Sequence, residues 1–184
     1  MNKQWLIIGA VVAVLFASYL WNRNNETVMD ETPIVEELIT QDDGTVVKKT
    51  GELIEEISPE EQAEKKQEIE DKVMDEVPVE MMATEGMEGS GSFQKKFEDG
   101  TYYQKVKVSD LEPLNKGSYY EAWLQNEAGD SISIGRLEMM GGTGSLYYQA
   151  KADRSEYNKV VVTKEIEDGN GEMGQVVLEG SCTE

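Results

Sequence analysis

The side chains that could carry out chemistry in this chain are almost all acidic. Among its 184 residues there are 37 Asp and Glu against 17 Lys and Arg, with no histidine and one cysteine. Histidine is the commonest general base and the commonest transition-metal ligand in proteins, so both roles lack their usual residue. The single thiol, Cys182, can form neither an intramolecular disulfide nor a thiolate zinc site. It is left as an incidental free thiol or as half of an intermolecular disulfide.

One acidic segment has the spacing of a metal-binding loop. In EDGNGE, residues 167–172, the side chains Asp168, Asn170 and Glu172 alternate as in half of a calcium loop. Such a loop needs glycine at its sixth place and a distal bidentate glutamate, and Met173 occupies the sixth place. We therefore predict a plain hairpin turn here rather than a calcium site.

A second acidic pattern is the pair Glu165 and Glu167, which alternation would place on one face of a strand. Two carboxylates can catalyse acid–base reactions, but they need a cleft, and nothing in the sequence predicts one. We expect no enzyme activity, no cofactor and no metal ion. The formal net charge of −20 also argues against nucleic acid as a partner, because phosphate binding needs clustered Lys and Arg.

Aromatic residues are the other candidates for a binding surface. Trp123, in the strand-like stretch SYYEAWLQ, is either an exposed platform for a glycan or peptide or a core residue of a central strand, and we favour the core. Doubled tyrosines place one ring on each face of a strand, so one ring of each pair should be exposed. Tyr119 and Tyr147 are the exposed members that we predict, and together they form a candidate aromatic surface.

The elements that would position these residues begin at Phe93. Strand-like runs with alternating apolar residues are separated by turn-forming segments rich in Gly, Asn and Asp. The pattern predicts an all-β fold, a small antiparallel β-sandwich, over residues 93–184. Gly135 interrupts one run, which indicates a bulge or the close approach of another backbone. The predicted strands cover residues 92–98, 101–111, 118–125, 131–140, 144–152, 158–167 and 174–181.

The first 23 residues have a different composition. WLIIGAVVAVLFASYLW, residues 5–21, carries no charge and is bounded by aromatic residues that suit membrane interfaces. At about 1.5 Å per residue, a helix of this length nearly crosses a hydrocarbon core of about 30 Å. We predict a membrane anchor over residues 1–23, with Lys3 in the cytoplasm and the remaining chain on the other side. A cleaved signal peptide is the alternative, but no clear cleavage site follows the apolar run.

Residues 24–92 form a third block, with 21 Asp and Glu against 5 Lys. A stretch this acidic and this poor in aromatic residues buries too little apolar surface to become fully ordered, so we expect a largely mobile acidic stalk. One helix is predicted near residues 59–77, with Ser58 as N-cap and Pro59 at its first position. Its thin apolar stripe suits a solvated spacer, which we favour, or a docking helix. A short hairpin or loose chain precedes it.

Three stretches of the C-terminal block together resemble a known family. DLEPLNKGSYYEAWLQ, IGRLEMMGGTGSLYY and VVVTKEIEDGNGEMGQVVLEG follow one another as in the extracytoplasmic C-terminal domain of anti-sigma-K factors. The resemblance covers residues 93–181, about half of the chain, and implies a β-sandwich on the outer side of a single membrane helix. In complete anti-sigma factors a cytoplasmic N-terminal domain binds the sigma factor. Because only a few residues precede Trp5, we do not expect direct sigma binding.

Together these patterns predict a membrane-anchored, non-enzymatic module outside the cytoplasm. We expect a single-pass protein of the plasma (inner) membrane in a bacterial envelope, whose sandwich takes part in protein interaction or sensing. The alternative is a structural or adhesive envelope protein that binds cell-surface polysaccharide through exposed tyrosines. The two hypotheses differ in the expected partner, which is an envelope protein in the first and a glycan in the second.

Overall fold

The computed structural model describes residues 35–40, 46–169 and 171–182. These residues form twelve strands and one helix, and every strand pairing is antiparallel. The prediction of a mostly β, antiparallel fold is therefore confirmed. The anchor predicted over residues 1–23 lies outside the described residues. Within the part of the chain that is described, no helix is both long enough and apolar enough to span a membrane.

The acidic block and the C-terminal block both contribute strands to the fold, and the acidic block also contributes the helix. The acidic block supplies β1 (Glu36–Thr40), β2 (Val46–Thr50), β3 (Leu53–Glu56), α2 (Pro59–Val73) and β4 (Val79–Ala83). β5 (Ser90–Glu98) crosses the predicted boundary between residues 92 and 93. The C-terminal block supplies the remaining strands, β6 (Thr101–Ser109), β7 (Ser118–Gln125), β8 (Ser131–Arg136), β9 (Glu138–Met140), β10 (Thr143–Ala150), β11 (Lys159–Ile166) and β12 (Gln175–Ser181). All strands predicted from the sequence are present, and the run predicted over residues 131–140 is divided into β8 and β9.

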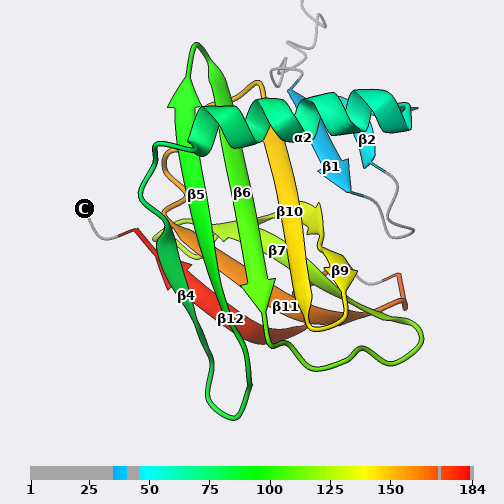
Figure 1. Cartoon of the computed structure of the whole chain (residues 1–184), viewed down its shortest axis with the longest axis vertical. Coiled ribbons are helices and arrows are strands. Elements are labelled where there is room, and N and C mark those ends of the chain that lie inside the picture. Colours follow the sequence, from blue (N-terminus) through cyan, green and yellow to red (C-terminus); the bar gives the residue numbers. More distant parts are fainter. Residues whose placement is uncertain (1–34, 41–45, 170, 183–184) are drawn as a thin grey trace, which may run out of the picture. The chain divides into compact units, whose positions relative to one another are not determined.

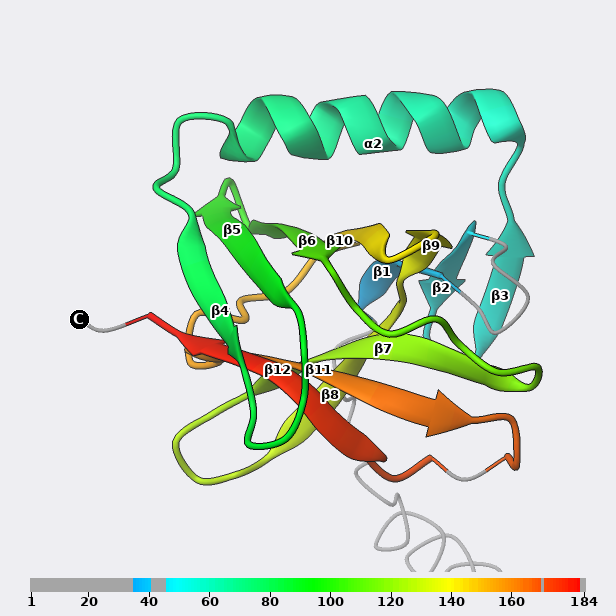
Figure 2. The same ribbon diagram turned by 60° about the horizontal axis from the view of Figure 1, so that its bottom comes forward.

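All the strands belong to one hydrogen-bonded sheet. Neighbouring strands follow the order β3-β2-β1-β10-β6-β5-β4-β12-β11-β7-β8, and β9 pairs with β10. The sheet bends at β4, which pairs with β5 on one side and with β12 on the other. The strands on either side of this bend form two layers that cross each other (Figures 1 and 2). The expected β-sandwich is thus one continuous sheet folded into two layers.

The main core fills the space between the two layers. As alternation predicts for β7, Tyr120, Ala122 and Leu124 lie inside it, each at most 1% exposed. Val160 and Val162 of β11 join them from the neighbouring strand. Because buried apolar surface stabilises a fold by about 25 cal/mol per Å², this core supplies the larger share of the hydrophobic stabilisation.

The last strand of the sheet, β8, comes close to β1 at Gly135. A Cβ atom at this position would lie 2.9 Å from the backbone nitrogen of Thr40 in β1 and 3.1 Å from its carbonyl oxygen. Gly135 has a φ of 115°, which favours glycine. The pairing of β7 with β8 also shifts register between Ala122 and Trp123. The predicted bulge and the predicted close approach of another backbone are both confirmed.

Helix α2 packs across the outer face of the layer that contains β5, β6 and β10 (Figure 2). Its start is as predicted, because the Ser58 hydroxyl accepts a hydrogen bond of 3.2 Å from the Glu61 N–H. It ends at Val73 rather than near residue 77. Ile69 and Val73 are buried against Tyr103 of β6. The spacer interpretation is therefore wrong, and the helix docks on its own sheet.

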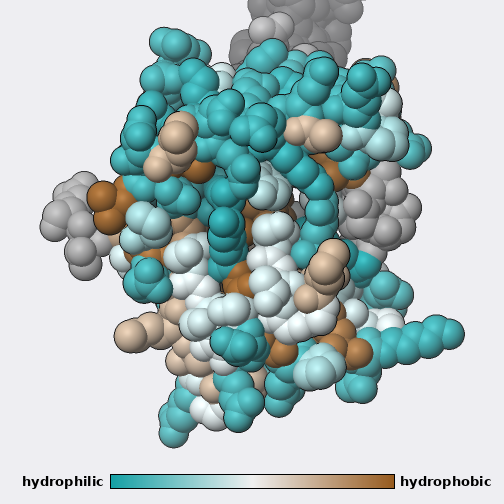
Figure 3. Space-filling model, viewed as in Figure 1, coloured by the Kyte–Doolittle hydropathy of each residue, from teal (hydrophilic) through white to brown (hydrophobic). Residues whose placement is uncertain are grey.

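The surface on this side of the molecule is divided between helix and sheet. The outward side of α2 is largely hydrophilic, whereas the strands below it carry more neutral and apolar side chains (Figure 3). A helix that buries one stripe and exposes a charged face is the ordinary arrangement of a surface helix.

The stalk predicted over residues 24–92 needs correction for its described part. From residue 35 onward the described chain forms one compact unit, in which Leu38 of β1 lies opposite Gln149 of β10. β1 and β2 are paired as the hairpin interpretation requires, although the turn itself, residues 41–45, lies outside the described residues. The high charge did not prevent packing, because the few apolar side chains of β1, β2 and α2 share one cluster.

Candidate functional site

The two tyrosines predicted to form an aromatic surface lie on opposite outer faces of the folded sheet. Tyr120 is in the main core, so its neighbour Tyr119 faces outward from the layer that contains β7. Tyr147 of β10 lies on the outer face of the other layer and packs against the cluster that includes Ile69 of α2. Both rings are half-buried. The structure therefore does not bring Tyr119 and Tyr147 into a common surface.

Tyr119 lies beneath a cation. The guanidinium carbon of Arg136 is 3.7 Å from the centre of the Tyr119 ring, and the Arg136 Nη2 atom is 3.1 Å from Glu167 Oε1. Glu165 is buried, and its Oε1 accepts a hydrogen bond of 2.8 Å from the Gly174 N–H. The two carboxylates singled out in the sequence thus make separate structural contacts.

The loop with calcium-like spacing connects the antiparallel neighbours β11 and β12, so the predicted hairpin is confirmed. Its residue 170 lies outside the described residues. The Asp168 N–H donates to the Ile166 carbonyl at 2.8 Å, which tightens the start of the turn. Among the residues that the structure describes, no group of three or more acidic, cysteine or histidine side chains is placed to hold a metal ion.

Trp123 has a structural position. It is 7% exposed, and its indole N–H donates a hydrogen bond of 2.9 Å to the hydroxyl of Thr163 in β11. Its neighbour Leu124 points into the main core, so Trp123 is buried on the outer side of the same strand. The prediction that this ring is buried is confirmed, although it lies outside the main core.

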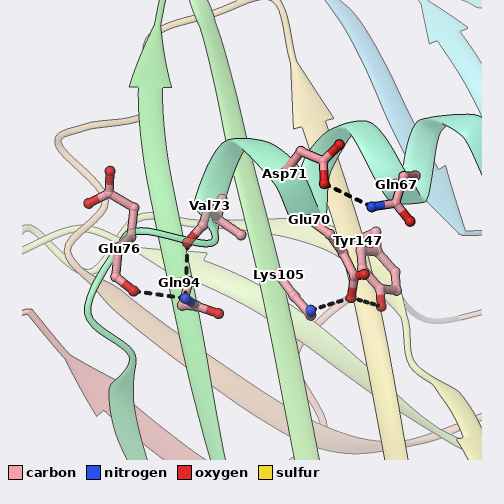
Figure 4. A network of polar contacts seen from close by, with 8 residues as sticks. All are labelled: Gln67, Glu70, Asp71, Val73, Glu76, Gln94, Lys105 and Tyr147. Carbon is pink, nitrogen blue, oxygen red and sulfur yellow. Dashed lines mark hydrogen bonds and ion pairs between the residues drawn. The ribbon is translucent and has the colours of Figure 1, made fainter.

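Tyr147 belongs to a polar network that fixes α2 to the sheet (Figure 4). The Tyr147 hydroxyl donates to Glu70 Oε1 at 2.8 Å, and the ammonium group of Lys105 bonds the same oxygen. Lys105 and Tyr147 hold the pKa of Glu70 below its usual range. Burial, followed by the hydrogen bond to Glu70, raises the pKa of Tyr147 to about 12. At neutral pH the lowered pKa therefore keeps Glu70 as a carboxylate, and the raised pKa keeps the Tyr147 phenol protonated.

The C-terminal end of α2 is fixed by a side chain of β5. The Gln94 Nε2 atom donates to the carbonyl of Val73 at 2.9 Å and to that of Glu76 at 2.7 Å (Figure 4). Carbonyl groups at the end of a helix lack partners within it, so this amide satisfies acceptors that would otherwise need water. An ion pair between Lys72 and Glu98 joins the same end of the helix to β5.

A hollow of about 570 Å³ lies beside Tyr147. The strand register places Ser145 of β10 opposite Lys107 of β6 on one side and opposite Glu138 of β9 on the other. The Lys66 ammonium of α2 contacts both carboxylate oxygens of Glu138, at 2.6 and 2.7 Å. The residues that line the hollow are Lys107, Glu138, Met139, Met140, Thr143, Gly144, Ser145 and Tyr147.

Lys107 is the ammonium group of this hollow that forms no direct ion pair among the described residues, although the charge of Glu70 also acts on it. Glu138 is paired with Lys66, and Glu70 is paired with Lys105. The charge of Lys105, followed by burial, lowers the pKa of Lys107. The positive charges of Lys105 and Lys107 repel each other, and an anion bound beside Lys107 would relieve that repulsion. The hollow therefore offers cationic and hydroxyl donors to a ligand.

Strand β3 forms one end of the sheet, and among the described strands it pairs with β2 alone. All four of its residues are exposed, including Leu53 at 66% and Ile54 at 52%. Thr50 and Leu53 are opposite each other across a two-residue loop, so they form the first hydrogen-bonded pair of the hairpin. The peptide groups of Ile54 and Glu56 then point to the free edge, where strands of other chains can add.

Neither the hollow nor the β3 edge was predicted from the sequence. The alternation of lysine and valine over residues 105–108 and the polar residues Thr143 and Ser145 were visible signals, but only the register of β6 with β10 brings them together. The LIEE sequence of β3 has no alternation that would indicate a strand.

Comparison with known proteins identifies no relative. No protein family, no curated protein and no solved structure matches this chain. The resemblance of residues 93–181 to the outer domain of anti-sigma-K factors therefore stays a prediction.

Proposed function

We propose that this protein is a membrane-anchored interaction module of the bacterial envelope, and that it binds an extended segment of another envelope protein along β3. The observation that carries the proposal is the free edge of β3, with outward peptide groups and two exposed aliphatic side chains, Leu53 and Ile54. In strand addition, main-chain hydrogen bonds supply affinity and side chains supply specificity. The apolar segment 5–21 and the resemblance to an extracytoplasmic domain support the proposed location.

The charges of β3 indicate the chemistry of the partner. Glu55 and Glu56 are exposed at the end of the strand, and on the β2 side Glu55 lies opposite Lys48. Opposite charges across neighbouring strands stabilise pairing, whereas like charges oppose it. A partner segment with Lys or Arg opposite Glu56 would therefore bind better than an acidic one.

The cluster of buried residues beneath α2 supports the β3 edge through β1 and β2. β3 pairs with β2, and β2 pairs with β1. Val46 of β2 and Leu38 of β1 are buried in the same cluster as Ile69 and Val73 of α2. Packing against the helix thus supports the β2–β3 hairpin, because an isolated two-stranded hairpin is only marginally stable in water.

The test compares Ile54→Pro with Ile54→Val. Proline removes the outward N–H of Ile54 but leaves the bonds of Leu53 and Glu55 to β2, whereas valine keeps that N–H. We expect a photoreactive residue in place of Glu56 to crosslink an envelope protein in intact cells. The crosslink should be lost in Ile54→Pro and kept in Ile54→Val, with unchanged melting temperatures. Equal crosslinking in both variants, or none from position 56, would contradict the proposal.

A second candidate function is a structural or adhesive role through binding of cell-surface polysaccharide. The observation that favours it is the hollow beside Tyr147, which combines hydroxyl, ammonium and apolar groups in one concave site. Tyr119 faces outward from the other layer and takes no part in this candidate site.

A further inference from the structure

We infer that the hollow bounded by β6, β9 and β10 binds an acidic sugar, a uronic acid unit of a polysaccharide, whose carboxylate pairs with Lys107. The inference rests on the second candidate function and names the class of its ligand. It does not depend on strand addition at β3.

The local charge favours an anionic ligand although the chain carries a net charge of −20. Around the hollow lie three ammonium groups, those of Lys66, Lys105 and Lys107, and two carboxylates, those of Glu70 and Glu138. The two carboxylates are bound to Lys105 and Lys66. Charges farther away than about 8 Å are largely screened at physiological ionic strength, so a ligand in the hollow is attracted mainly by Lys107, which lines the hollow and forms no direct ion pair within the described part of the chain.

The polar wall suits the hydroxyl groups of a sugar ring. Thr143 and Ser145 are two positions apart on β10 and both line the hollow. At about 3.4 Å per residue they lie about 7 Å apart along the strand, so they can contact different hydroxyl groups of one sugar unit. The register places Ser145 directly opposite Lys107, which sets a hydroxyl beside the ammonium that would hold the carboxylate.

The apolar wall suits the C–H face of the same ring. Met140 of β9 is 88% exposed and lies opposite Thr143, so it lines the hollow beside the hydroxyl row, whereas its neighbour Met139 packs against the main core. Methionine is flexible and polarisable, and it adapts to ligands of irregular shape. A ligand that matches Lys107, the polar wall and the apolar wall therefore has one anionic group, several hydroxyl groups and an apolar face, as a uronic acid has.

Stacking on Tyr147 is not the main contact of the site. Its ring already lies near two ammonium groups, with Lys105 Nζ at 5.6 Å and Lys66 Nζ at 5.9 Å from the ring centre. Its hydroxyl is bound to Glu70. The selectivity of the hollow therefore comes from charge, and a neutral sugar should bind poorly.

The test is an NMR titration of the full chain in nonionic detergent with a galacturonic acid trimer, a neutral galactose trimer and inorganic phosphate. We expect the acidic trimer alone to shift the amide signals of Lys107 and Ser145. Lys107→Gln should weaken its binding about tenfold, as expected for the loss of one charge-assisted hydrogen bond. Lys116→Gln, an equal change of charge at an exposed lysine outside the hollow, should leave the binding unchanged.

Other outcomes distinguish the acidic-sugar inference from the broader hypothesis of polysaccharide binding. Equal binding of the neutral and acidic trimers would overturn the acidic-sugar inference and keep polysaccharide binding. Absence of binding by both trimers would overturn both. Phosphate that binds as tightly as the acidic trimer would overturn the assignment to a sugar, and unchanged binding in Lys107→Gln would overturn the assignment to this hollow.

Discussion

The main core and the cluster beneath α2 are stabilised in different ways. The main core lies between two layers of a continuous sheet and draws apolar residues from both layers. The cluster beneath α2 has six buried residues: Leu38, Val46, Ile57, Ile69, Val73 and Tyr103. Around it, lysines of the helix and of β6 pair with glutamates. The helix therefore depends on a small apolar contact and on charge, and we expect it to open before the sheet does.

This difference matters for both proposed functions. α2 supports β1 and β2, which hold the β3 edge, and its Lys66 neutralises Glu138 at the hollow. Opening of the helix would remove the support of the β3 edge. It would also separate Lys66 from Glu138 and leave the negative charge of Glu138 beside the hollow. The stability of one local contact thus bears on two binding surfaces.

The largest expected effect is in the main core. Leu124→Ala removes a side chain with no exposed surface, and we expect a loss of about 3–5 kcal/mol in the free energy of unfolding. Because the core joins both layers, the two layers of the sheet should unfold together in urea, whether followed by far-ultraviolet circular dichroism or by tryptophan fluorescence. A loss of less than about 1 kcal/mol would show that the main core is not the dominant source of stability.

A smaller and local effect is expected beneath the helix. Ile69→Ala should cost about 2–3 kcal/mol, because the residue is fully buried but lies in a small cluster that can relax. Hydrogen exchange should become faster in residues 59–73 and stay slow in β6 and β11. Met74→Ala, at a residue that is 68% exposed, is the matched control and should change neither. Equal acceleration in the sheet would mean that the helix and the sheet form one cooperative unit.

The smallest effect is electrostatic and depends on pH. Glu70→Gln should destabilise the helix by about 1 kcal/mol at pH 7, since the Glu70 side chain is 37% exposed and its ion pair with Lys105 is partly screened. The pKa of Glu70 lies below its usual 4.5, so its contribution is complete above that value and is lost as the pH falls below it. The difference between wild type and variant, measured by urea unfolding from pH 7 to pH 3, should shrink towards zero.

Glu64→Gln is the control for this pH dependence. Glu64 lies on the exposed side of the same helix, so its replacement removes the same charge without touching Lys105 or Tyr147. We expect no pH-dependent difference from wild type. A difference as large as that of Glu70→Gln would assign the effect to the total charge of the helix rather than to the network.

The strands of the C-terminal block could be predicted because each carries its own evidence. In β7 buried apolar side chains alternate, β11 contains a short run of valines, and turn residues mark the ends of both strands. Burial of Trp123 and the irregularity at Gly135 followed from the same local patterns. The start of α2 was equally local, because Ser58, Pro59 and Glu61 lie within four positions.

What was missed depends on contacts between distant parts of the chain. The few apolar residues of β1 and β2 become buried only when β10 and α2 cover them, so composition alone indicated a mobile stalk. Tyr119 and Tyr147 were assigned to one surface because alternation gives the face of a strand but not the layer to which it belongs. Lys107 and Ser145 are neighbours only through the register of β6 with β10.

The order of the strands has a consequence for how the chain folds. β1 and α2 are synthesised early, but β1 pairs with the much later strand β10, with Glu37 opposite Ala150. Ile69 and Val73 of α2 likewise become buried only when Tyr103 of β6 packs against them. Pairings across such long loops make folding slow, so this segment must persist without its partners while the rest of the chain emerges. The dense negative charge of residues 24–92 keeps such an intermediate soluble. The acidity that resembled a spacer in the sequence is then a protection against aggregation during folding.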